Sequence, residues 1–207
     1  MNVDLLAVSG IAIVVFATTN IDDLLILAVF FANPQMRVGA VVAGQFLGVA
    51  GLVLASAVAA LLAMVVPGEW IALLGLVPLA LGLRLLPALF GKAGDSDEET
   101  AAALAGQHLS IRGGFIAQSL TVAGVTLANG GDNLGVYIPL FATAPLAIGS
   151  YVVVFAAMTA VWCALAYSMV NNPLIGDRIR RHGHMLLPVV LIGLGLYILA
   201  DAVALMR

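Results

Sequence analysis

Two neighbouring aspartates lie near the centre of an apolar stretch that is long enough to cross a membrane. The stretch covers residues 5–31, and Asp22 and Asp23 follow Thr19 and Asn20 within it. Placing a carboxylate at the centre of a bilayer costs from about 2.5 to more than 10 kcal/mol, depending on how the cost is measured. Acidic side chains in this position commonly mark a route for ions or protons. We therefore interpret the segment as part of a cation pathway.

A related motif occurs in the second half of the chain, where Asn129 is followed by Asp132 and Asn133. Asn129 lies 109 positions after Asn20 (129 − 20), and at this offset Asp132 corresponds to Asp23. In both motifs the Asn and the Asp are three positions apart, so they share one face of a regular helix. The pattern predicts an internal repeat in which each half contributes polar ligands to one site.

Asp22 points about 100° away from Asp23 on a regular helix, so a joint site needs local unwinding or a neighbouring helix. The pair Gly130-Gly131 makes unwinding easy in the second motif. An unwound turn also frees backbone carbonyl groups, which bind cations in many transporters. Three further polar residues of these apolar segments are expected to line the same cavity: Thr19, Gln45 and Thr126.

The intramembrane carboxylates lack a basic partner in the sequence, so protons or a bound cation must neutralise them. Carboxylate and amide oxygens favour hard divalent ions such as Ca²⁺, Mn²⁺ and Mg²⁺. The single cysteine, Cys163, excludes a disulfide framework and any Cys-x-x-Cys metal site. The alternative is a structural role, in which the polar side chains hold helices together at about 0.6 kcal/mol per hydrogen bond. Three carboxylates with no Lys or Arg nearby in the apolar segments are poorly suited to that role.

The composition is that of an integral membrane protein. Hydrophobic residues make up 63% of the chain, charged residues 9%, and the mean hydropathy is +1.14. Soluble domains are about 45–50% apolar and about 25% charged. This composition argues against a soluble enzyme and against a nucleic-acid-binding protein, so we expect no catalytic residues and no cofactor.

The apolar pattern predicts an all-α fold with six membrane spans. Turn residues and polar stretches separate them, and the spans cover residues 5–31, 38–66, 70–90, 112–142, 146–170 and 185–206. The first and fourth spans are overlong and contain the polar motifs. We therefore expect these two to be tilted or broken helices.

Basic residues predict the orientation. With six spans, one side of the membrane receives seven of the eight Lys and Arg residues: Arg37, Arg84, Lys92, Arg112, Arg178, Arg180 and Arg181. The positive-inside rule places that side in the cytoplasm and both termini outside. Residues 1–207 then form a single membrane domain, with repeat one at 1–90, a cytoplasmic linker at 91–111 and repeat two at 112–207. Three spans per repeat make the second copy inverted in the membrane.

Four motifs carry a resemblance to a known family. They are Thr-Asn-Ile-Asp-Asp, Gly-Gln-Phe-Leu-Gly, Leu-Leu-Gly-Leu-Val-Pro and Ala-Asn-Gly-Gly-Asp-Asn-Leu-Gly-Val-Tyr-Ile-Pro-Leu-Phe. With these the chain is similar to the cadmium-resistance transporter family, part of the lysine-exporter superfamily. The resemblance implies a multi-pass protein of the bacterial inner membrane that exports Cd²⁺. It also implies a metal site built from Asn20, Asp22, Asp23, Asn129, Asp132 and Asn133.

The prediction is therefore a secondary transporter that exports a divalent cation, with Cd²⁺ favoured, in exchange for protons. Metal ion, protons and lipid are its expected partners, and a homodimer stays open. One alternative is an exporter of organic cations or amino acids, which would need an aromatic or apolar lining. No Trp or Tyr flanks the motif of the first span. Another alternative is a membrane chaperone or insertion subunit whose polar residues only shape a groove.

Overall fold

The computed structural model describes residues 5–63, 76–85, 114–171, 192–196 and 198–199, and every element in these ranges is helical. The helices are α1 (Leu5–Thr19), α2 (Ile21–Ala32), α3 (Val38–Ala63), α5 (Leu76–Leu85), α7 (Phe115–Asn129), α8 (Gly131–Thr143), the 3-10 turn η2 (Pro145–Ala147) and α9 (Ile148–Asn171). The all-α expectation is confirmed for this part of the chain. The linker 91–111 and most of the predicted sixth span lie outside the described residues.

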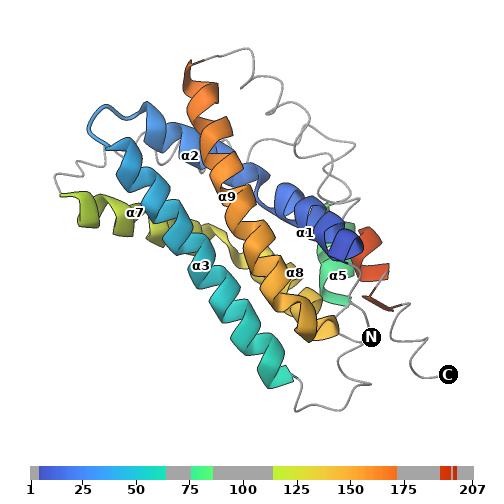
Figure 1. Ribbon diagram of the computed structural model, residues 1–207. Coiled ribbons are helices and arrows are strands. Elements are labelled where there is room, and N and C mark those ends of the chain that lie inside the picture. The colour runs from blue at the N-terminus through green and yellow to red at the C-terminus, as the bar shows by residue number, and fades with distance from the viewer. Residues whose placement is uncertain (1–4, 64–75, 86–113, 172–191, 197, 200–207) are drawn as a thin grey trace.

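The two expected broken helices are present. One residue, Asn20, separates α1 from α2, and the two helices meet at a bend of 59°. One residue, Gly130, likewise separates α7 from α8. In both places the polar motif lies at the interruption, where intrahelical hydrogen bonds end. The breaks are visible in the blue and yellow ribbons of Figure 1.

Within the described residues, two helical segments are long and apolar enough to cross a membrane, Val38–Ala63 and Pro145–Asn171. The bent pair α1–α2 makes a third candidate when it is counted as one span. Helix α7 is apolar but has only 15 residues. The structure thus supports a membrane protein with two or three recognisable spans, and the count of six remains a prediction.

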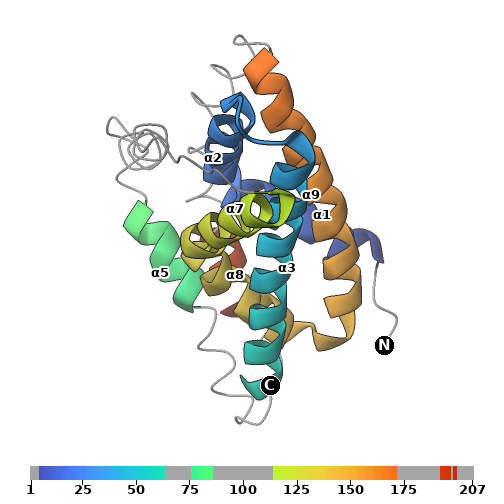
Figure 2. The same ribbon diagram turned by 90° about the vertical axis from the view of Figure 1, so that its left-hand side faces the viewer.

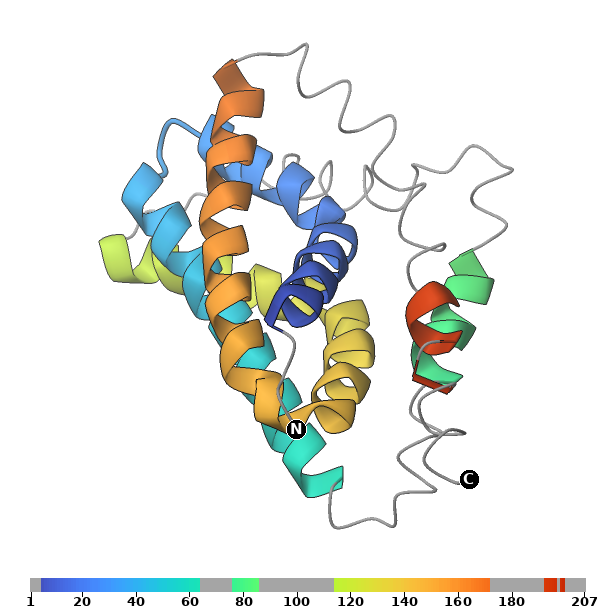
Figure 3. The same cartoon turned by 45° about the vertical axis from the view of Figure 1, so that its right-hand side comes forward.

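Each long helix packs on the broken pair of the other half of the chain. Helix α3 packs mainly on α7 and α8, whereas α9 packs on α1 and α2. Figure 1 shows α3 running down the molecule and α9 running up, and Figure 3 shows the same opposition. The pairs α1–α2 and α7–α8 also run in opposite directions (Figures 1 and 2).

Helix boundaries in the two halves correspond at a constant offset. The starts of α1, α2 and α3 precede those of α7, α8 and α9 by 110 positions each (115 − 5, 131 − 21, 148 − 38). The register suggested by the sequence motifs was 109, because it paired Asn20 with Asn129. The helices instead pair Asn20 with Gly130, since these two residues occupy the breaks.

Close approach between α3 and α7 depends on two glycines of α3. A Cβ added to Gly44 would lie 2.5 Å from the carbonyl oxygen of Ser119 and 2.6 Å from Cβ of Val122. A Cβ added to Gly48 would lie 2.6 Å from Cβ of Thr126. Small residues at such positions let helix backbones approach closely in membranes. This contact positions Gln45 and Thr126 within reach of one another.

The variant Gly44→Ala is expected to destabilise the protein by about 1–3 kcal/mol, because α7 must move away from α3. Gly39→Ala is the matched control on the same helix, since its added Cβ would make an ordinary 3.6 Å contact with the Phe115 ring. Alanine favours a helix over glycine by about 1 kcal/mol, so the control should keep or gain stability. The apparent melting temperatures of the purified variants in detergent measure both effects. Equal changes in the two variants would contradict the close contact.

Candidate metal-binding site

The break at Asn20 places a helix N-terminus next to the two aspartates. Asp22 and Asp23 lie in the first turn of α2, and Asp132 lies in the first turn of α8. Backbone N–H groups at a helix N-terminus carry the equivalent of about half a positive charge. The breaks therefore partly offset the cost of carboxylates in an apolar environment, and an unbroken helix would offer no such compensation.

Asp23 is the buried centre of a polar cluster between α2, α3 and α7. Its side chain is 2% exposed, and its two carboxylate oxygens accept hydrogen bonds from two neutral amides. Gln45 Nε2 donates to Oδ2 at 3.0 Å, and Asn129 Nδ2 donates to Oδ1 at 3.0 Å. Thr126 donates its hydroxyl to Gln45 Oε1 at 2.6 Å and so fixes the orientation of that amide.

Asn129 also reaches the second aspartate. Its Nδ2 atom donates to Asp22 Oδ2 at 2.6 Å as well as to Asp23. A residue of the other half of the chain thus draws together two carboxylates that a regular helix would splay apart. We call these five residues the acidic cluster: Asp22, Asp23, Gln45, Thr126 and Asn129. The Gln45 and Asn129 amides that donate to Asp23 are uncharged, so the cluster keeps a net negative charge when Asp23 is ionised.

A second polar cluster surrounds Asn20. The Asn20 Nδ2 atom lies 2.8 Å from the Tyr137 hydroxyl, 2.9 Å from Phe16 O, 3.0 Å from Thr19 Oγ1 and 3.4 Å from Asn133 Oδ1. The Tyr137 hydroxyl and Thr19 Oγ1 are 3.4 Å apart. We call Thr19, Asn20, Asn133 and Tyr137 the amide–tyrosine cluster. Asn20 is therefore engaged in holding the break together rather than in facing the acidic cluster.

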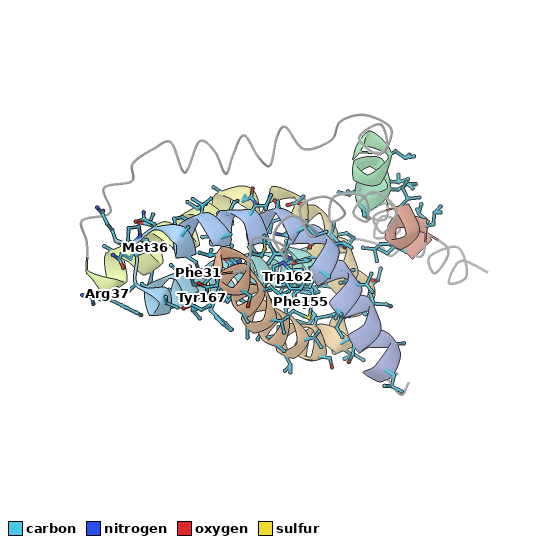
Figure 4. All side chains as sticks on the ribbon, turned by 90° about the horizontal axis from the view of Figure 1, so that it is seen from above. Phe31, Met36, Arg37, Phe155, Trp162 and Tyr167 are labelled. Carbon is cyan, nitrogen blue, oxygen red and sulfur yellow. The ribbon has the colours of Figure 1, made fainter. Side chains whose placement is uncertain are left out.

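Helix α9 completes the second cluster. The Trp162 indole N–H donates to the backbone carbonyl of Asn20 at 2.6 Å and so satisfies a group that the helix break leaves free. Figure 4 shows Trp162 and Phe155 of α9 in the interior of the bundle, far from Arg37 at its end. The indole ring meets Phe16 edge-on, with ring centroids 5.6 Å apart. These rings fill the space beside the break.

The two breaks have related positions but different surroundings. At the offset of 110 positions, Trp162 corresponds to Leu52 and Gly130 corresponds to Asn20 (162 − 52, 130 − 20). Trp162 contacts Asn20 at the first break, and Leu52 lies against Gly130 at the second. In the same way, Thr126 corresponds to Phe16 and Gln45 corresponds to Phe155 (126 − 16, 155 − 45). Thr126 and Gln45 are joined by a hydrogen bond, whereas the rings of Phe16 and Phe155 pack with their centroids 5.4 Å apart. A polar pair beside one break therefore corresponds to an aromatic pair beside the other.

The predicted site residues thus divide between two clusters. The Oδ1 atom of Asp132 accepts the backbone N–H of Asn133 at 2.8 Å. In the part of the chain that the structure describes, no three His, Cys, Asp or Glu side chains come close enough to hold one ion. Any ion bound here would need amide or hydroxyl oxygens beside Asp22 and Asp23.

Sequence reasoning missed two participants. Tyr137 follows Asn133 by four positions, so helical spacing already placed both on one face of α8. Trp162 carried no comparable signal, because its partner is a backbone carbonyl 142 positions away. These residues also bring Trp and Tyr next to the first motif. Tyr137, Phe155 and Trp162 are 1%, 1% and 7% exposed, so they pack as core rather than line an open binding surface.

Comparison with known proteins identifies a family. The model of the family described as cadmium resistance transporter matches residues 16–206, which include both helix breaks and both clusters. Comparison with curated proteins and with solved structures returned no match. The match covers nearly the whole chain and agrees with the resemblance of the four motifs. The chain belongs to the cadmium resistance transporter family.

Proposed function

We propose that the protein is a secondary transporter that exports a divalent cation, Cd²⁺ foremost, from the cytoplasm in exchange for protons. The acidic cluster is the proposed binding site. The observation that carries the proposal is the convergence of Asp22 and Asp23 on one point, the Asn129 Nδ2 atom, at the start of a broken helix. Carboxylates arranged in this way are suited to enclosing a cation.

The chemistry of the cluster fits a weakly held divalent ion. Asp22 and Asp23 supply charge, and the Gln45, Thr126 and Asn129 side chains carry neutral oxygens at the same place. Cd²⁺ is close to Ca²⁺ in size, and oxygen ligands bind ions of that size with flexible geometry. A transporter must also release its cargo, so ligands that are weaker than thiolates are an advantage.

The relation between the two halves supports a transport mechanism. We propose that 1–90 and 112–207 are inverted repeats, since corresponding helices run in opposite directions at a constant offset of 110 positions. Sites of such transporters lie near the membrane midplane, at the interface between repeats and beside discontinuous helices. The acidic cluster lies between the halves and beside a discontinuous helix, because α2 and α3 belong to one half and α7 to the other. Its place near the midplane is part of the proposal.

The remaining parts of the proposal concern the setting of the protein. We place it in the bacterial inner membrane with six spans, both termini outside and residues 91–111 in the cytoplasm. Arg37 lies at one end of the bundle (Figure 4), and we assign this end to the cytoplasm by the positive-inside rule. Packed rings beside Asn20 leave little support for an exporter of organic cations or amino acids.

Transport by the purified protein tests the proposal. Proteoliposomes with a fluorescent metal indicator inside are given Cd²⁺ outside and an acidic interior. We expect wild-type vesicles to accumulate Cd²⁺ well above protein-free vesicles, and Mg²⁺, lysine and a quaternary ammonium ion to be transported less. Accumulation of lysine or the organic cation without Cd²⁺ would support the alternative exporter. Accumulation of none of these would contradict a transport function.

A further inference from the structure

A single nitrogen atom lies between the two carboxylates of the acidic cluster and donates a hydrogen bond to each. Asn129 Nδ2 donates to Asp22 Oδ2 at 2.6 Å and to Asp23 Oδ1 at 3.0 Å. An amide group has two N–H bonds, so each carboxylate receives one of them. The orientation of the amide follows from its partners, because its oxygen cannot accept from ionised carboxylates.

We propose that the Asn129 amide occupies the position of the transported cation in the metal-free protein, so that metal binding must displace it. This rests on the function proposed above and assigns Asn129 a role different from that of a simple ligand. The two carboxylate oxygens would be about 2.3–2.6 Å from a bound ion of this size. The amide nitrogen has no lone pair to offer a metal, so nitrogen and ion exclude each other from this point.

The position of Asn129 in the fold allows such a displacement. It is the last residue of α7 and precedes the break at Gly130. Three positions earlier, Thr126 stays bound to Gln45, which holds α7 against α3 independently of Asn129. Loss of the Asn129 contacts therefore frees the end of α7 while its body stays in place, and the joint to α8 can respond. Competition from the amide also weakens cation binding, which aids release.

The sign of an affinity change tests the proposal. The variants Asn129→Ala and Asn129→Leu remove the donor, the first by truncation and the second at similar volume. Each should raise Cd²⁺ affinity by at least about tenfold, because the ion no longer has to break the two charge-assisted hydrogen bonds of the amide. Isothermal titration calorimetry of the purified protein in detergent measures this directly. The titrations are run at about pH 7 and about pH 9, because fewer protons compete for the carboxylates at the higher pH.

Controls separate this proposal from the proposed function. Asn171→Ala removes an exposed asparagine amide at the end of α9, where it donates only to Tyr167 O, and should leave Cd²⁺ affinity unchanged. Asp23→Asn should lose binding if the acidic cluster is the site. Retained binding in Asp23→Asn would overturn the site itself. A different result would overturn the displacement of Asn129 alone. In that case Asp23→Asn loses Cd²⁺ binding, but either folded Asn129 variant binds Cd²⁺ at about pH 9 no more tightly than the wild type. Asn129 would then be an ordinary ligand or a structural residue.

Discussion

Replacement of Asp23 by asparagine is expected to abolish Cd²⁺ export and to weaken Cd²⁺ binding by more than about 100-fold. Loss of residues that merely support a metal ligand typically costs about 10–100-fold in affinity, and Asp23 is proposed to touch the ion. The variant lacks one of the two charges that replace the hydration shell of a divalent ion. Cadmium tolerance of an efflux-deficient host and uptake into proteoliposomes measure the loss.

The same variant should fold and insert normally, because the hydrogen bonds around residue 23 can reverse. Thr126 currently donates to Gln45, and Gln45 donates to Asp23. If the Gln45 amide turns over, its oxygen accepts from the new amide and its nitrogen donates to the Thr126 hydroxyl, which is both donor and acceptor. The new asparagine oxygen still accepts from Asn129. Membrane yield and elution as a single species from size exclusion should therefore equal the wild type.

Asp132→Asn distinguishes two versions of the site. Symmetric use of both motifs predicts that it loses export as completely as Asp23→Asn. The Asp132 carboxylate accepts the Asn133 backbone N–H, whereas Asp22 and Asp23 share the Asn129 amide, so we expect a smaller loss. Glu99→Gln, in the 91–111 linker, controls for expression and for removal of an acidic charge elsewhere. Full tolerance in Asp23→Asn would reject the acidic cluster as the metal site.

Much of the fold could be predicted because it depends on local patterns. Apolar runs and turn residues located the helices, and the polar motifs located both breaks, since Asn20 and Gly130 interrupt otherwise apolar segments. The offset between the two halves is 109 by the sequence motifs and 110 by the helix starts. Matching residue types paired Asn20 with Asn129, whereas the helix ends and the contacts of Trp162 and Leu52 depend on where each half of the chain bends.

The site could be predicted only in part, because contacts between helices depend on rotation about each helix axis. Sequence spacing grouped Asn20 with Asp23 on one face of a regular helix. The break between them turns Asn20 toward Tyr137 and Trp162, while Asp23 faces Gln45 and α7. Sequence reasoning could name polar residues that lie at membrane depth. It could not assign them to two separate clusters, since that assignment follows from the 59° bend and from packing.

Export of a divalent cation against an interior-negative membrane potential sets the energy requirement. Moving two positive charges outward against 100 mV costs about 4.6 kcal/mol, at about 2.3 kcal/mol per charge. One entering proton returns about half of this amount, so at least about two protons per metal ion are needed for electrical balance. The proton gradient is the source of energy in the antiport proposed above.

Cd²⁺ uptake into everted membrane vesicles should therefore require an interior-acid proton gradient and stop when a protonophore is added. The acidic cluster suits this exchange, because the Asn129 and Gln45 amides that donate to Asp22 and Asp23 carry no charge, and protons can take the place of the departing metal charge. The measurement follows metal uptake and interior pH together, and protons should leave the vesicles as Cd²⁺ enters. Asp23→Asn vesicles, carrying the same gradient, should show neither flux. Cd²⁺ accumulation that survives the protonophore and follows a sodium gradient instead would contradict proton coupling. In that case two entering sodium ions would have to supply the charge balance that we assign to the two protons.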